Sequence, residues 1–291
     1  MSFSDDAKDG VTDGVTVELP LYQVDAFTDR VFWGNPAAVC PLEDWLPDEV
    51  MQAIALENNL PETAFIVPVG DAYDLRWFTP ATEVELCGHA TLGAAHVVFT
   101  HLRPEWDQVT FRSASGPLVV SRDGGRMSLS FPVLDYEQVD PPRALLEGLG
   151  PARPVAVYRS MDYLVVFEDE ERLRSVRPDQ TLLATLDLRG VVITAPGSAT
   201  DFSSRFFGPK LSIPEDPITG SAHCALVPYW AQRLGRTWLR ARQFSPRLGS
   251  TLAIDLECEL RGDRVVLRGS AKEYMSGTIH LTASDLVQAE A

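Results

Sequence analysis

Two short segments of the sequence place a small, flexible residue at the predicted start of a helix. They are C-G-H-A-T, which begins at Cys87, and T-G-S-A-H, which begins at Thr219. The first backbone N–H groups of a helix have no partner within the helix and carry partial positive charge. Gly88, Gly220 and Ser221 are therefore candidates to bind a carboxylate or a developing enolate. The glycines could instead serve only close helix packing, but recurrence of the pattern in both halves of the chain favours a binding site.

Three titratable residues near these segments could hold or move a proton. Glu62 lies in the segment L-P-E-T-A-F, and His89 directly follows Gly88. Asp216 lies four residues before Gly220, close enough to the second helix start to bind a substrate amine or hydroxyl. A carboxylate in an apolar setting suits proton transfer, and histidine exchanges protons near neutral pH. Each residue also has a structural interpretation, as a turn residue or as a packing residue at a helix terminus.

The cysteines and histidines could form two other kinds of site. Cys87 could be the base of a racemase, because a helix N-terminus lowers the pKa of a thiol. A two-cysteine epimerase would need a second thiol at the repeat-equivalent position, which is Thr219. A metal site is not predicted, because no pair has ordinary zinc spacing among the candidate ligands Cys87, His89, His96, His223 and Cys224.

The elements that would position these residues occur twice in the chain. Four features recur in the same order with offsets between 128 and 132 residues, which two copies of one domain explain better than chance. The matched pairs are PDEVMQAIAL and PDQTLLATL, AFIVP and VITAP, DLRWFTP and SSRFFGP, and CGHATL and TGSAHC.

Each copy is predicted to contain short strands around one apolar helix. In the second copy this helix spans 221–234 and ends at Gly235, and Pro228 is expected to kink or split it. A DGG hairpin turn is expected at 123–125. The corresponding elements of the first copy are a helix over 47–58, strands over 64–67 and 75–78, and a buried helix over 89–102.

Mixed strands with few helices predict an α+β protein of two pseudo-symmetric domains. We expect a disordered tail over 1–16, an N-terminal repeat domain over 17–138 and a C-terminal repeat domain over 155–271. The segment 139–154 is predicted to link the copies, and a C-terminal strand from about 272–288 is a candidate to complete the first domain.

Composition excludes several classes of protein. The 291 residues are 45% hydrophobic and 23% charged, which is typical of a globular chain. The net charge of −16 disfavours nucleic acid and anionic lipid as partners. No apolar run approaches the roughly 20 residues of a membrane span, and the acidic N-terminus does not resemble a signal peptide, so a cytoplasmic protein is predicted. No nucleotide-binding motif occurs, so no cofactor is predicted.

The motifs together resemble the PhzF-like family of phenazine biosynthesis, which is related in fold to diaminopimelate epimerase. The resemblance covers about residues 20–235. It implies two domains, each a curled mixed β-sheet around a central helix, and a cofactor-independent isomerase. The matching stretches are VDAFTDRVFWGNPAAV, NNLPETAF, RWFTPATEVELCGHATLGAAH and EDPITGSAH.

The family's functional residues map onto the residues already singled out. The resemblance implies that Glu62 carries a proton between carbons, with His89 and Asp216 beside it. It further implies that backbone N–H groups of Gly220 and Ser221 bind the substrate carboxylate. One departure is the proline that precedes Glu62, at a position where serine is common in the family.

We therefore predict an isomerase or epimerase that moves a proton between carbons of a small carboxylated metabolite. Glu62 is the proposed shuttle, and His89 and Asp216 polarise and orient the substrate. The alternatives are a non-catalytic protein that binds small anions and a racemase based on Cys87. A second copy of the chain, forming a homodimer, is a possible protein partner. The substrate and the pathway do not follow from the sequence.

Overall fold

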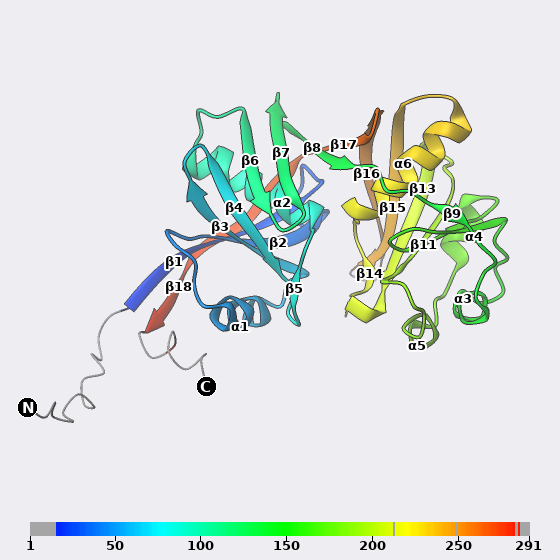
Figure 1. The fold of residues 1–291 in the computed structure, drawn as a ribbon, viewed down its shortest axis with the longest axis horizontal. Helices are drawn as coiled ribbons and strands as arrows, with labels where there is room; N and C mark the ends of the chain where they lie inside the picture. The colour runs from blue at the N-terminus through cyan, green and yellow to red at the C-terminus, as the bar shows by residue number, and fades with distance from the viewer. Residues whose placement is uncertain (1–15, 212, 248–249, 283–284, 286–291) are drawn as a thin grey trace, which may run out of the picture.

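The computed structural model describes residues 16–211, 213–247, 250–282 and 285, so most of the predicted tail lies outside the described residues. Thr16 itself begins a strand. Figure 1 shows two halves of similar design side by side. The N-terminal half contains β1 (Thr16–Ala26), β2 (Asn35–Pro41), α1 (Asp48–Asn58), β3 (Glu62–Val69), β4 (Ala72–Phe78), β5 (Glu83–Val84), α2 (Gly88–Val97), a π-helical turn (Val98–Leu102), β6 (Gln108–Ser113), β7 (Gly116–Asp123) and β8 (Arg126–Pro132).

The C-terminal half repeats this order of elements, with two short helices where the first half has α1. Its last strand, β18, returns to the N-terminal half. The elements are β9 (Glu137–Gln138), α3 (Arg143–Gly148), β10 (Ala156–Arg159), β11 (Tyr163–Val166), α4 (Glu170–Ser175), α5 (Gln180–Leu183), β12 (Val191–Pro196), β13 (Phe202–Gly208), a 3-10 turn (Pro209–Leu211), β14 (Ile213–Asp216), α6 (Gly220–Leu234), β15 (Trp238–Arg247), β16 (Ser250–Arg261), β17 (Arg264–Gly269) and β18 (Ala271–Thr282).

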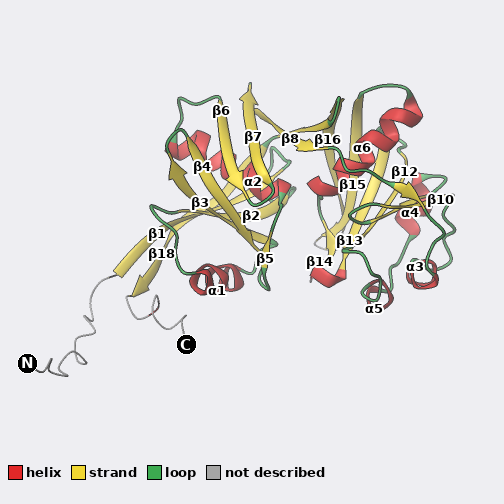
Figure 2. Ribbon diagram, in the orientation of Figure 1, coloured by secondary structure: helices red, strands yellow, loops and turns green. Residues whose placement is uncertain are grey.

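The strands of the two halves pair in the same pattern. Each half begins with an antiparallel pair (β1–β2 and β10–β11), continues with a parallel pair (β2–β3 and β11–β12) and then forms a hairpin (β3–β4 and β12–β13). Phe65 lies opposite Arg76 in the first hairpin, and Ile193 lies opposite Arg205 in the second. These registers confirm the predicted repeat, and Figure 2 shows the strand-rich α+β architecture.

Two antiparallel pairings connect segments that are distant in the sequence. β8 of the first half pairs with β17 of the second, from Pro132 opposite Arg264 to Met127 opposite Gly269. β18 pairs with β1 along its whole length. The first strand of each half therefore gains a partner from outside the repeat, β18 for β1 and β9 for β10.

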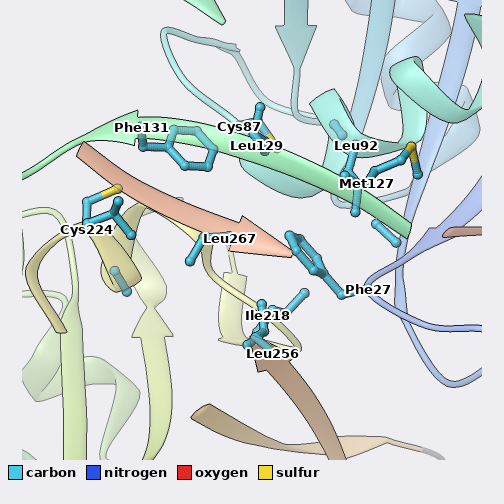
Figure 3. Packing of buried hydrophobic residues seen from close by; sticks show 14 of the residues in the cluster. Phe27, Cys87, Leu92, Met127, Leu129, Phe131, Ile218, Cys224, Leu256 and Leu267 are labelled. Atoms are coloured by element: carbon cyan, nitrogen blue, oxygen red, sulfur yellow. The ribbon is translucent and has the colours of Figure 1, made fainter. Parts of the chain in front are cut away.

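Each half encloses its central helix and carries further helices outside its sheet. Side chains of a strand alternate between the two faces. Ala64 and Ile66 of β3 pack in the core around α2, whereas Phe65 and Val67 pack against α1 on the outer face. Figure 3 shows the inner core continuing between the halves, where Phe131 of β8 and Leu267 of β17 lie near each other.

The predicted turn and helices are largely confirmed. Gly124 and Gly125 connect β7 to β8 with positive φ values of 55° and 84°, which a two-residue hairpin turn requires. α2 is buried on all sides except at His96, and its helical path continues as the π-helical turn. α6 ends at Gly235 as predicted.

The structure refines two expectations about local structure. Pro228 lies inside a single helix, so α6 is not split there. The segment 139–154, which was expected to link the copies, contains the short helix α3, whose Leu145 is fully buried in the outer core of the C-terminal half. Burial of that leucine attaches the segment to the C-terminal half. Among the described residues, no helix has both the length and the apolar composition needed to cross a membrane.

Candidate active site

The starts of α2 and α6 meet where the two halves face each other. A Cβ atom built on Gly88 would lie 3.4 Å from the Cα atom of Gly220 and 3.0 Å from Cζ of Phe131. The residues before the helices, Cys87 and Thr219, provide no side-chain cap for the first backbone N–H groups. Uncapped, buried helix ends of this kind need a partner from elsewhere, such as a ligand. The structure thus brings together the two glycines that the sequence singled out.

Glu62 and His89 form a buried acid–base pair in the N-terminal half. Glu62 is the first residue of β3, and the parallel pairing with β2 sets it opposite Ala37. His89 is the second residue of α2. Its Nε2 atom lies 3.0 Å from Oε2 of Glu62, although the angle is not that of a hydrogen bond. Burial alone lowers the pKa of His89, but Cys87 and Glu62 raise it, and it lies well above its ordinary value.

Asn35 connects this pair to the C-terminal half, and the sequence analysis missed it. Its Nδ2 atom lies 3.1 Å from Nδ1 of His89 and donates to Oδ1 of Asp216 at 2.7 Å and to the carbonyl oxygen of Ile218 at 3.2 Å. Asn35 opens β2 and is fully buried. The only available signal was its place in G-N-P-A-A-V, one of the stretches that carry the family resemblance.

Asp216 is held at the end of β14 by hydrogen bonds on several sides. Its Oδ2 atom accepts a hydrogen bond from Thr219, and its backbone carbonyl accepts one from Nε2 of Gln243 at 2.8 Å. Burial raises the pKa of Asp216 to about 6, against the lowering influence of His89 and of the hydrogen bonds from Thr219 and Asn35. An acid with this pKa exchanges its proton close to physiological pH.

Ser221 has a charged neighbour that the sequence analysis also missed. Nη2 of Arg189 donates to the hydroxyl of Ser221 at 2.9 Å and to Oδ2 of Asp162 at 2.7 Å. Nε of Arg189 donates to the other Asp162 oxygen at 3.0 Å. No sequence pattern marked Arg189, which directly precedes the glycine before β12.

These side chains surround a cavity of about 40 Å³ between the halves. Pockets that bind small molecules usually have volumes of about 300–1,000 Å³, so this cavity is narrow. The cavity must widen before a metabolite can enter. Its lining consists of Glu62, Leu86, Cys87, Gly88, His89, Arg189, Phe206, Leu211, Ile213, Asp216, Ile218, Thr219, Gly220 and Ser221.

The environment of Cys87 does not favour a thiolate. Burial, together with the nearby Glu62 carboxylate, raises the pKa of Cys87, and His89 opposes this only in part. The lowered pKa expected for a thiol at a helix N-terminus is therefore not found. Burial outweighs the effect of the helix end in this case.

The five candidate metal ligands named from the sequence do not gather into one cluster. In the described parts of the chain, only Glu62, Cys87 and His89 bring ligand atoms within 4.8 Å of one another. Sγ of Cys87 lies 3.5 Å from Nδ1 of His89, and Oε2 of Glu62 lies 3.0 Å from Nε2. His223 instead bonds the carbonyl of Thr219 through Nδ1 at 2.8 Å.

Comparison with known proteins gives consistent matches over most of the chain. A family model described as phenazine biosynthesis-like protein matches residues 24–277. An uncharacterized isomerase of Pseudomonas aeruginosa is 51% identical over 265 residues, covering 91% of this chain and 100% of the relative. An uncharacterized isomerase of Halalkalibacterium halodurans is 45% identical over 258 residues, covering 87% of this chain and 95% of the relative.

A solved structure agrees with the sequence matches. The crystal structure of a PhzF-family phenazine biosynthesis protein from Enterococcus faecalis has a TM-score of 0.85 at 45% identity, covering 91% of this chain and 100% of that chain. The predicted resemblance is confirmed by these matches, as is the α+β fold of two pseudo-symmetric halves. The chain is an isomerase and belongs to the phenazine biosynthesis-like (PhzF) protein family.

Proposed function

We propose that the enzyme moves a proton between carbons of a small carboxylated metabolite, without a cofactor, in the cavity between its halves. The observation that carries this proposal is the buried pair of Glu62 and His89 beside the two uncapped helix starts. A proton carrier and a site for negative charge are the two parts that proton transfer next to a carboxylate requires.

Each side chain has a proposed role. Glu62 takes the proton from one carbon and returns it to another. His89 polarises Glu62 and stabilises its charged form, because its own pKa lies well above the ordinary value. Asp216, which has a pKa of about 6, orients the substrate through a hydrogen bond from an amine or hydroxyl group. Gly88, Gly220 and Ser221 offer backbone N–H groups to the carboxylate.

A solvent-deuterium experiment tests this proposal even while the substrate is unidentified. The wild-type protein is incubated in D₂O with a panel of small carboxylic acids, and mass spectrometry detects those that gain one mass unit. We expect at least one acid to incorporate deuterium with the wild-type protein and not with Glu62→Gln. Incorporation that is equal in both proteins, or absent throughout a broad panel of cellular carboxylic acids, would contradict the proposed function.

The two alternatives make different predictions in the same experiment. A protein that only binds anions would cause no exchange but would still bind members of the panel. A racemase based on Cys87 would keep its exchange in Glu62→Gln and lose it in Cys87→Ser. The raised pKa of Cys87 speaks against this second alternative at neutral pH.

We further propose that the protein forms a homodimer, so that a second copy of the chain is its protein partner. Its proposed location is the cytoplasm. Among the described strands β18 pairs only with β1, and it exposes Tyr274 and Met275, with the Tyr274 ring 5.5 Å from that of the exposed Phe32. A long edge strand with apolar side chains is a typical pairing surface. Light scattering should give twice the chain mass of 32.1 kDa, and a mass of one chain would contradict a dimer.

A further inference from the structure

The pseudo-symmetry of the halves places two different pairs of side chains at equivalent positions. His89 and Ser221 are each the second residue of their helix, directly after the glycine. The hairpin registers make Gly190 the counterpart of Glu62, so Arg189 lies one residue before that counterpart. In the N-terminal half, Glu62 of β3 contacts His89 at the start of α2. In the C-terminal half, Arg189, which lies just before β12, contacts Ser221 at the start of α6.

The Arg189 guanidinium is held in a fixed orientation with donors to spare. Asp162, which is buried, accepts from both Nε and Nη2 of Arg189, at 3.0 and 2.7 Å. Nη2 also donates to Ser221. Within the described residues, Nη1 makes no hydrogen bond, and an arginine carries two N–H groups on that atom. The guanidinium can therefore bind another anion without giving up Asp162.

Charge in the cavity is unevenly distributed. Of the described side chains that line it, Glu62 and Asp216 are acids, and Arg189 is the only arginine or lysine. His89, whose pKa is raised, adds positive charge, but it lies 3.0 Å from Glu62. Arg189 is paired with Asp162 and still has free N–H donors beside Ser221, so the start of α6 is the more favourable place for a substrate carboxylate.

We propose that Arg189, with Ser221 and the first N–H groups of α6, binds the carboxylate of the substrate. This inference rests on the proposed function and adds the substrate class, an acid whose exchanging carbon is attached to, or conjugated with, its carboxylate. When Glu62 removes the proton, the electron pair of the C–H bond moves toward the carboxylate oxygens. The guanidinium then faces the oxygens on which negative charge grows, and such preorganised donors lower the barrier.

Acetate and acetamide provide a direct test, because they have nearly the same shape and differ in charge. Both need the same widening of the cavity, so a difference in binding reports the charge of the site. Saturation-transfer NMR on the methyl signal measures binding of each probe to the full-length protein. The test variant is the double substitution Arg189→Gln with Asp162→Asn, which removes both charges of the pair and leaves no buried carboxylate unpaired.

A control variant removes an exposed pair of the same type. Arg143 and Glu147 form an ion pair at 2.7 Å in α3, outside the cavity lining, so Arg143→Gln with Glu147→Gln changes charge equally. We expect this control to bind acetate like the wild type. The test variant should bind acetate about tenfold more weakly or worse, as expected from the loss of charged hydrogen bonds, with acetamide binding unchanged.

The result also separates this inference from the proposed function. Acetate binding requires no catalysis, so the wild-type preference for acetate can be found even if no acid exchanges deuterium. In that case Arg189 binds the anion but the proton-transfer proposal fails. Equal signals from acetate and acetamide with the wild-type protein would overturn the inference, and so would the absence of a signal from both. Unchanged acetate binding by the test variant would overturn it too. A test variant that is unfolded by circular dichroism is replaced by Arg189→Lys, which keeps a positive charge for Asp162. Weaker acetate binding is expected for it as well, because a single ammonium nitrogen cannot hold Asp162, Ser221 and acetate in the arrangement of the guanidinium.

Discussion

The amide of Asn35 and the carboxylate of Asp216, which are 181 residues apart in the sequence, share a hydrogen bond of 2.7 Å. The same amide nitrogen lies 3.1 Å from His89. One side chain of the N-terminal half thus aligns a candidate proton carrier of its own half with an acid of the other. Because the amide donates to Asp216, it also lowers the pKa of this acid and limits the increase that burial causes.

Replacing Asn35 by alanine should therefore disturb both halves of the site. Without the amide donor, the pKa of Asp216 should rise further above 6, and His89 should lose a positioning contact. We expect kcat to fall about tenfold or more, with the pH profile of kcat/KM shifted to higher pH on its acidic limb. The rates are measured on the acid that the deuterium experiment identifies.

A matched control for Asn35 is Gln52→Ala in α1. Gln52 donates a side-chain amide hydrogen bond to the carbonyl of Thr79 at 2.8 Å, and, like Asn35, it is not among the residues that line the cavity. Its removal should leave the pH profile unchanged. If Asn35→Ala loses stability to the same degree as the control and keeps its pH profile, Asn35 has no positioning role.

Substitutions of Glu62 and Cys87 should separate the two proton-transfer mechanisms. Glu62→Gln keeps the size of the side chain but removes its acid–base function, so the rate should fall by about 10²–10⁴-fold with little change in binding. Glu62→Asp should also lose activity, because the shorter side chain withdraws the carboxyl group from the substrate. Cys87→Ser should cost little. Deuterium exchange that survives Glu62→Gln and disappears in Cys87→Ser would reverse this assignment.

The two halves and the helix starts could be predicted because the repeat preserves residue spacing. Gly88 and Gly220 were found through patterns that occur at nearly the same offset, and strand registers then reproduced that offset. A repeated pattern reports the shared scaffold. It also identifies the residues that break the symmetry, such as Glu62 and Asp216.

Arg189 and Asn35 could not be found in this way. Their importance comes from contacts across the fold, with Ser221 in α6 and with Asp216 in β14, that no local spacing encodes. The lowered pKa on which the Cys87 racemase alternative depends is not found, for a related reason. A helix N-terminus can be recognised from sequence, whereas full burial of the thiol depends on packing between the halves.

Gly88 and Gly93 offer a comparison of two glycines in the same helix. A Cβ on Gly88 would lie 3.0 Å from Phe131 and 3.4 Å from Gly220, whereas a Cβ on Gly93 meets nothing closer than 3.6 Å. Gly88→Ala should lower the free energy of unfolding by about 1–3 kcal/mol through overpacking and should weaken acetate binding. Gly93→Ala should be neutral or stabilising by up to about 1 kcal/mol, because alanine favours helix. Urea denaturation measures both, and equal effects would contradict close contact of the helix starts.

His223 should make the fold sensitive to acid. Burial lowers the pKa of His223 to about 4, against an ordinary value of 6.5, with a smaller opposing influence from its bond to the Thr219 carbonyl. The unfolded chain therefore binds a proton at this residue before the folded chain does. Its contribution to stability is complete above pH 6.5 and is lost as the pH falls toward 4, by about 3 kcal/mol in total. Asp216, with its raised pKa, acts in the opposite direction over nearly the same range.

His223→Asn isolates this contribution, because the asparagine Nδ2 can replace the Nδ1 donor to Thr219 and does not titrate. The variant should be less stable than the wild type at pH 7, where the smaller side chain leaves a cavity. As the pH falls from 7 to 4.5 the difference should shrink by about 2 kcal/mol or more, since only the wild type loses the histidine contribution. Asp216 is present in both proteins, so its opposing influence cancels in the difference. Urea unfolding at both pH values measures the change, and a difference that stays constant would show that His223 titrates alike in the folded and unfolded chains.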